Sequence, residues 1–182
     1  MRKILILFYF FILNSSTVHA NVINEQLNKL FSDLKISSES SSFLIEQKIW
    51  KLWSTHPNDE KLTSLLAEGS AAVNNNQLTE AINIFTTVIE LDPNWAEAWN
   101  KRATVFYLVG QFQKSQDDID KVLNLEKRHF GALAGQGLVN IQLKNFEKAI
   151  KSYQKALEIY PSMRSPEIMI KEIEALIKQE LI

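Results

Sequence analysis

The residues that could do acid–base or metal chemistry are few and widely separated. Beyond residue 20 the chain has two histidines, His56 in front of a proline and His129 in a predicted connection between helices. Neither belongs to a metal-binding spacing such as His-Glu-x-x-His, so solvated or helix-capping roles are expected for both. No nucleophile lies in a pattern that pairs it with a base. The sequence therefore predicts a protein that is not an enzyme.

Two denser patterns were considered as metal or phosphate sites. Asp117, Asp118 and Asp120 form the densest acidic cluster, but at these offsets on a helix they do not share one face. A solvated convex surface is expected there, with a divalent-cation site as the alternative. Gly135-Gln136-Gly137 lies inside a helical pattern and follows no strand, unlike a phosphate-binding loop. The sequence thus predicts no metal and no cofactor.

The composition narrows the class of protein. The chain has 182 residues, 46% of them hydrophobic and 23% charged, with a formal net charge of −1. These values fit one modest globular domain, and the missing basic excess argues against a nucleic-acid partner. Because there is no cysteine, disulfides and thiolate metal sites are excluded.

The first 20 residues have the layout of a secretory signal peptide. A basic pair at residues 2–3 precedes the apolar run Ile4–Leu13, and Val18 and Ala20 are small residues at the expected cleavage positions. The run is shorter than the ~20 residues that span a bilayer as a helix. We expect export to a bacterial periplasm with cleavage near Ala20-Asn21, which leaves no integral membrane span. An uncleaved inner-membrane anchor is the alternative.

A pattern of small and large residues recurs every 34 residues, over 62–95, 96–129 and 130–163. Each copy reads as two amphipathic helices joined by a short turn. A small residue in the first helix and another in the second are expected where the two helices cross closely, because larger side chains would hold them apart. The first set of small positions is Gly69, Ala103 and Gly137, the second is Ala81, Ser115 and Ala149, and the large positions are Phe85, Ile119 and Tyr153.

This pattern resembles the tetratricopeptide repeat (TPR) family, with closing prolines at Pro93 and Pro161. The resemblance implies an all-α fold, a right-handed α-solenoid of three helix hairpins. One departure is consistent: the family's leucine before the first small residue is replaced by Glu68, Arg102 and Gln136. A variant packing at that position is expected.

A narrower resemblance rests on three stretches, Ile45–Trp53, Trp99–Ala103 and Lys127–Leu133. Together they are similar to small TPR proteins of alphaproteobacteria that carry a signal peptide. This resemblance implies no catalytic residues.

Helices are also expected on both sides of the repeats. Residues 21–56 show two amphipathic stretches separated by the serine cluster Ser37–Ser42, which predicts an N-terminal helical hairpin. We expect it to cap the first repeat, because the end faces of solenoids need cover, although a Trp-rich docking surface is compatible with this role. Ser165-Pro166 begins a predicted C-terminal capping helix over 165–182.

The TPR resemblance implies that the first helices of the repeats line a concave groove, where partner segments bind. Asn100 could then bond a partner amide with both its donor and its acceptor, and Gly131 and Ala134 would let a partner backbone come close. The predicted partner-binding residues are Leu66, Ser70, Glu97, Asn100, Thr104, Tyr107, Gly131, Ala134, Leu138 and Ile141.

Some TPR proteins capture a chain-end carboxylate with basic residues in this groove. At the corresponding positions this chain has Leu66, Ser70, Lys101, Gly131 and Gly135, of which Lys101 alone fits. Recognition of that type is therefore not expected.

The sequence thus favours a non-catalytic protein–protein interaction module, or scaffold, that binds an unidentified protein or peptide partner. Two alternatives stay open. One is a structural or dimerising subunit of an envelope assembly, which includes a homodimer. The other is an accessory subunit of an envelope enzyme.

Overall fold

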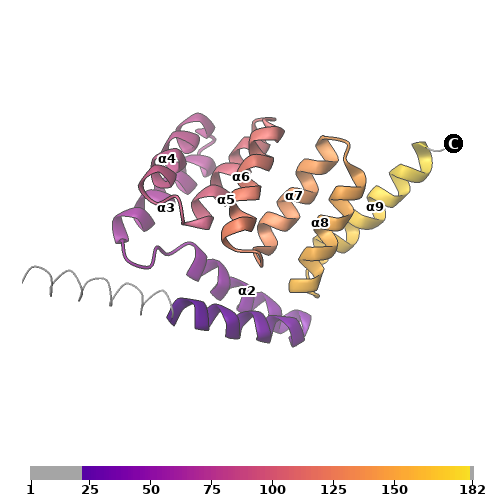
Figure 1. Cartoon of the computed structure of the whole chain (residues 1–182), viewed down its shortest axis with the longest axis horizontal. Helices are drawn as coiled ribbons and strands as arrows, with labels where there is room; N and C mark the ends of the chain where they lie inside the picture. The colour runs from indigo at the N-terminus through magenta and orange to yellow at the C-terminus, as the bar shows by residue number, and fades with distance from the viewer. Residues whose placement is uncertain (1–21, 181–182) are drawn as a thin grey trace, which may run out of the picture.

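The computed structural model describes residues 22–180, and every regular element in that part is a helix. A helix over 22–36 and α2 (Glu39–Trp53) form the N-terminal hairpin. Three helix pairs and α9 (Arg164–Glu180) follow, stacked side by side in an α-solenoid (Figure 1). None of the helices within 22–180 combines the length and apolar character needed to cross a bilayer. The predicted signal peptide lies outside the described residues.

The helix pairs fall on the predicted repeat. Their second helices begin at Leu78, Phe112 and Phe146, which are 34 residues apart. The all-α solenoid expected from the sequence is therefore confirmed. The pairs are α3 (Glu60–Asn74) with α4 (Leu78–Leu91), α5 (Ala96–Leu108) with α6 (Phe112–Leu125), and α7 (Phe130–Gln142) with α8 (Phe146–Ile159).

Each pair turns at one left-handed residue: Asn76 (φ 59°), Gly110 (φ 75°) and Lys144 (φ 58°). The residue after each left-handed residue closes the turn with its backbone N–H. In the first repeat, the Gln77 N–H donates to the Ala72 carbonyl at 2.8 Å. This is the hydrogen bond of a Schellman cap, which ends a helix sharply.

The small positions lie where the two helices of a repeat cross. A Cβ added to Gly69 would lie 2.5 Å from Phe85 Cε1, and a Cβ on Gly137 would overlap the ring of Tyr153. In the middle repeat, the Ser115 hydroxyl donates to the Ala103 carbonyl at 2.8 Å. Close helix approach thus explains why these positions hold glycine, alanine or serine.

The residue that departs from the TPR pattern joins the second helices of neighbouring repeats. Arg102 donates through Nε and Nη2 to the Asp118 carboxylate, each at 2.8 Å, and through Nη1 to Thr86 at 3.0 Å. Asp118 is 4% exposed, so the expectation of a solvated side chain was wrong for it. Gln136 occupies the same place in the next repeat, where it accepts from Ser152 at 2.9 Å and lies 3.4 Å from Asp120.

The N-terminal hairpin lies along one edge of the solenoid, beneath the starts of α5 and α7 (Figure 1). Its apolar residues form one cluster with Phe130 and Tyr160, which belong to the third repeat. Trp53 also reaches the connection between the first and second repeats, because its carbonyl accepts from the Trp95 indole at 2.8 Å. The expected cap over the first repeat is thus a strap that joins the connections between repeats.

The C-terminal helix α9 covers the outer side of the last repeat. Ile173 is buried there, in one cluster with Ala149 and Tyr153. Ile168 and Leu176 remain 54% and 45% exposed. The helix begins at Arg164, whose guanidinium donates to Glu39 of the hairpin.

Candidate functional site: the concave groove

The first helices α3 and α5 and the hairpin line a pocket of about 240 Å³ at the place expected for the concave groove. It brings together three of the predicted residues, the half-buried Ser70 and Asn100 and the exposed Thr104. The pocket is also lined by Val73 and Lys101 from the repeats and by Trp50 from α2. Because these residues come from three helices, the site exists only in the folded array.

The pocket presents hydrogen-bond acceptors. The hydroxyls of Ser70 and Thr104 donate to carbonyls of their own helices, at 2.9 and 3.0 Å, which leaves their oxygen lone pairs available. Asn100 Nδ2 donates to Glu97 Oε2 at 3.1 Å, so its Oδ1 is left to accept. Because the amide nitrogen carries two N–H groups, Asn100 keeps one of them to donate, and its expected use as both donor and acceptor stays a prediction. Such a surface suits the N–H groups of a partner backbone.

Glu97 supports the groove from inside the protein. Its side chain is fully buried, and Oε2 also lies 3.0 Å from Nε2 of His129. Oε1 is 3.4 Å from Lys101 Nζ, an ion-pair distance without a hydrogen bond. Removing one partner of a buried charge leaves the other uncompensated, which is costly. Lys101 therefore balances the charge of Glu97. It is for this reason a poorer candidate for binding a partner carboxylate.

His129 is a buried structural residue. It is 0% exposed and stacks on Trp53 with ring centroids 4.0 Å apart. Its Nδ1 accepts from the Ala132 N–H at 3.0 Å and so caps α7. In a neutral ring the proton then belongs on Nε2, where it is donated to Glu97. The capping role expected from the sequence is present, whereas solvent exposure is not.

Trp50 occupies space that the sequence analysis left to a partner. A Cβ on Gly131 would lie 2.5 Å from Trp50 Cη2, so the glycine accommodates an indole of the same chain. The Trp50 indole N–H donates to Glu46 at 3.1 Å, which fixes the ring. Sequence reasoning did not place Trp50 in the groove. Two features of the sequence could have predicted this contact: a hairpin rich in tryptophan, and a glycine at the start of a helix that leaves room for a large ring.

The structure separates the other predicted groove residues. Leu66 is 2% exposed in the core of the first repeat, and Ala134 and Ile141 pack partly buried against the cluster beneath α9. Tyr107 is half-buried and packs on Phe112 with ring centroids 5.6 Å apart. Leu138 is 37% exposed. None of these five lines the groove pocket.

A charged cluster fixes the strap beside the groove. The Arg128 guanidinium lies 4.5 Å from the Phe31 ring centroid and donates to Asn28 at 2.6 Å, both in the 22–36 helix. It also donates to both carboxylate oxygens of Glu126, at 2.9 and 2.8 Å. Burial raises the pKa of Glu126, but the hydrogen bonds and charge of Arg128 outweigh burial and hold that pKa below its usual value.

Two matches to sequence models of the tetratricopeptide repeat cover residues 66–115 and 131–163. A TPR repeat-containing protein of Rhizobium etli is 32% identical over 142 residues, which cover 78% of this chain and 69% of the relative. A small glutamine-rich TPR-containing protein of Mycosarcoma maydis is 29% identical over 58% of this chain and 31% of its own length.

Solved structures share the fold at low identity. The first TPR domain of Spaghetti (RPAP3), bound to the HSP90 peptide SRMEEVD, has a TM-score of 0.64 and 21% identity, covering 66% of this chain and 96% of that one. MamA has a TM-score of 0.60 and 21% identity, covering 74% of this chain and 76% of that one.

The repeat spacing, the helix crossings and the extent of the Rhizobium etli match point to one conclusion. The chain belongs to the tetratricopeptide repeat family.

Proposed function

We propose that this protein is a non-catalytic interaction module that holds an extended segment of a partner protein in its concave groove. The observation that carries the proposal is the pocket between α3 and α5, in which Ser70, Asn100 and Thr104 offer acceptor oxygens. An extended backbone carries a free N–H row that such acceptors can bind. The peptide-bound TPR domains of similar fold support the same use of the groove.

A pull-down with the full mature chain tests this proposal. Ser70→Arg combined with Thr104→Arg fills the pocket with two long side chains while leaving the buried Glu97 and His129 untouched. Thr79→Arg with Thr87→Arg is the matched control, because both residues are exposed on α4, outside the pocket. The groove variant should lose a partner that the control retains. Retention by both variants would place binding elsewhere.

We further propose that the protein acts in a bacterial periplasm after removal of residues 1–20, by the signal-peptide layout of that segment. N-terminal sequencing of protein from the envelope fraction should begin near Asn21. A sequence that begins at Met1 would instead favour the membrane-anchored alternative.

A dimerising subunit is the second candidate, favoured by exposed apolar residues at the turn of the hairpin. Ile36, Phe43 and Leu44 are 87%, 59% and 64% exposed. Contiguous apolar surface that is exposed to solvent often marks an interface. Light scattering after size exclusion should then give twice the monomer mass, and Phe43→Ser with Leu44→Ser should restore the monomer. A monomer at all concentrations would exclude this candidate.

A further inference from the structure

A second hollow lies between the second helices α6 and α8, and it shares no lining residue with the groove pocket. It consists of two adjoining pockets of about 410 Å³ each, which have Gln136 and Lys155 in common. One end is lined by amides, lysines and Asp120, and the other by Leu123, Leu133 and Ile159 with the charged Lys127 and Glu158. The two pockets form a channel with α7 as its floor, which we call the α6–α8 channel.

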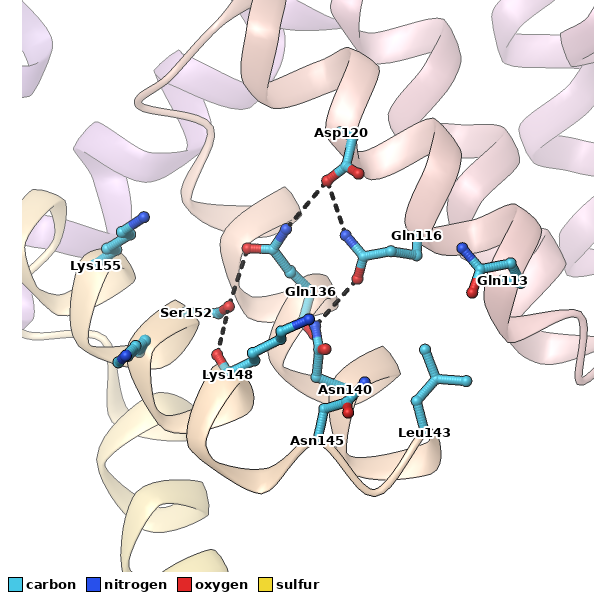
Figure 2. A pocket seen from close by; sticks show the side chains of 11 residues that line it. Gln113, Gln116, Asp120, Gln136, Asn140, Leu143, Asn145, Lys148, Ser152 and Lys155 are labelled. Atoms are coloured by element: carbon cyan, nitrogen blue, oxygen red, sulfur yellow. Dashed lines mark hydrogen bonds between the residues drawn. The ribbon is translucent and has the colours of Figure 1, made fainter.

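The floor of the α6–α8 channel is a chain of hydrogen-bonded polar side chains (Figure 2). Asn140 and Ser152 are each 5% exposed. Asn140 Nδ2 donates to Gln116 at 3.0 Å and to the Gln136 carbonyl at 2.8 Å, while Ser152 donates to the Gln136 side chain at 2.9 Å. Asp120 accepts from Gln116 at 2.8 Å. The floor is thus held in place by its own contacts.

Lysines line one wall of this channel. Lys148, Lys151 and Lys155 all come from α8, and Figure 2 shows Lys148 extending toward Asn140. Within the described residues, none of the three lies within 4.0 Å of a carboxylate oxygen. With Lys127 they give the lining four positive charges against two negative charges, on Asp120 and Glu158, and this positive excess attracts an anionic ligand.

At the equivalent positions, the preceding repeat has acidic residues among its basic ones. The residues 34 positions before the three lysines are Lys114, Asp117 and Lys121. The residue 34 positions before Ser152 is Asp118. Asp118 is bound by Arg102, which fills the position of Gln136. Two lysines there face two aspartates on one helix, whereas α8 has three lysines and a serine. With Arg102 counted, these five positions carry a net charge of 3 − 2 = +1 in the preceding repeat, against +3 in the α6–α8 channel.

We propose that the α6–α8 channel binds an acidic, extended segment of a partner protein, independently of the concave groove. Lys148 and Lys155 are about 10.5 Å apart along the helix axis, at 1.5 Å per residue. An extended segment covers that length in about three residue steps. Carboxylates on such a segment would meet the lysines, while Gln113, Gln116 and Asn145 line the channel and offer amides to its backbone. The Leu133 end would take an apolar side chain.

Fluorescence anisotropy with a labelled Glu-Gly-Glu-Gly-Glu-Leu peptide tests the proposal. The full mature chain should bind it at low ionic strength and release it as salt is added. The same peptide with Gln in place of Glu should bind at least about tenfold more weakly. Lys148→Gln with Lys155→Gln should weaken binding of the Glu peptide about tenfold, since each exposed ion pair changes affinity by about two- to fivefold.

Lys114→Gln with Lys121→Gln is the matched control, because it changes the net charge equally at the equivalent positions one repeat earlier. This control should stay within about twofold of the unchanged protein. Equal weakening by both variants, or no binding of the Glu peptide, would overturn the proposal. Displacement by equimolar inorganic phosphate would identify a small-anion site and overturn it too. Loss of binding in Ser70→Arg with Thr104→Arg would move the site to the groove.

Discussion

At the scale of single residues, two glycines on α7 differ in what surrounds them. A Cβ on Gly137 would overlap the Tyr153 ring, whereas a Cβ on Gly135 would make an ordinary 3.7 Å contact with Ile119. The sequence pattern assigned a packing role to Gly137 and none to Gly135. The structure confirms that distinction, because Gly137 faces α8 at the helix crossing.

Alanine at these two glycines should therefore have opposite effects. Gly137→Ala should destabilise the protein by about 1–3 kcal/mol through overpacking. Gly135→Ala should be neutral or stabilise by up to about 1 kcal/mol, because alanine favours the helix. Urea unfolding followed by circular dichroism measures both. Equal unfolding midpoints for the two variants would contradict the assigned helix crossing.

The hydroxyl of Tyr153 is buried and makes no hydrogen bond with the described residues. Burial raises its pKa to about 12. Tyr153→Phe should therefore stabilise the protein by about 1 kcal/mol at neutral pH, because no buried polar group is left unpaired. Phe85 already fills the equivalent place in the first repeat. A loss of stability in the urea midpoint would indicate a hydrogen-bond partner for this hydroxyl.

The same residue predicts how stability changes at high pH. Because the pKa of Tyr153 is raised on folding, its contribution is fully present below the unfolded value of about 10 and is lost as pH rises toward about 12. Tyr153→Phe should lose less stability than the unchanged protein across that range. Identical alkaline unfolding curves would contradict the burial of this hydroxyl.

At the scale of elements, the strap was predictable as a hairpin but not in its placement. Amphipathic spacing gave its two helices, whereas its docking depends on Trp50, Trp53 and Phe130, which are far apart in the sequence. Such long-range aromatic contacts leave no local pattern. For the same reason His129 read as a loop residue, although it is enclosed between Trp53 and Glu97.

Arg128 should fasten this strap in a pH-dependent way. Arg128→Gln should cost about 1–2 kcal/mol at neutral pH, from the lost ion pair with Glu126 and the lost contact with the Phe31 ring. The pKa of Glu126 is lowered, so the ion-pair part is present above the unfolded value of about 4.3 and is lost as pH falls through the folded value. The difference in urea midpoint between Arg128→Gln and the unchanged protein should thus be smaller at acidic pH than at neutral pH. An equal difference at both pH values would contradict the ion pair.

At the scale of the whole molecule, the 34-residue period was sufficient to predict the all-α solenoid. The candidate site was predicted less completely. Ser70, Asn100 and Thr104 meet in one pocket, but Leu66 serves the core and Glu97 is enclosed by His129, Asn100 and Lys101. A repeat pattern places residues on a helix face, whereas burial by another element depends on contacts that the period does not encode.

Site-specific photo-crosslinking in living cells tests the groove as the binding surface most directly. A photoreactive benzoylphenylalanine would replace Thr104, which is exposed and lines the pocket, or Thr87, which is exposed on α4. The proposed function predicts a discrete adduct with one partner protein from position 104 and none from position 87, and loss of the adduct when Ser70→Arg is added. A discrete adduct from position 87, or no adduct from position 104, would contradict it.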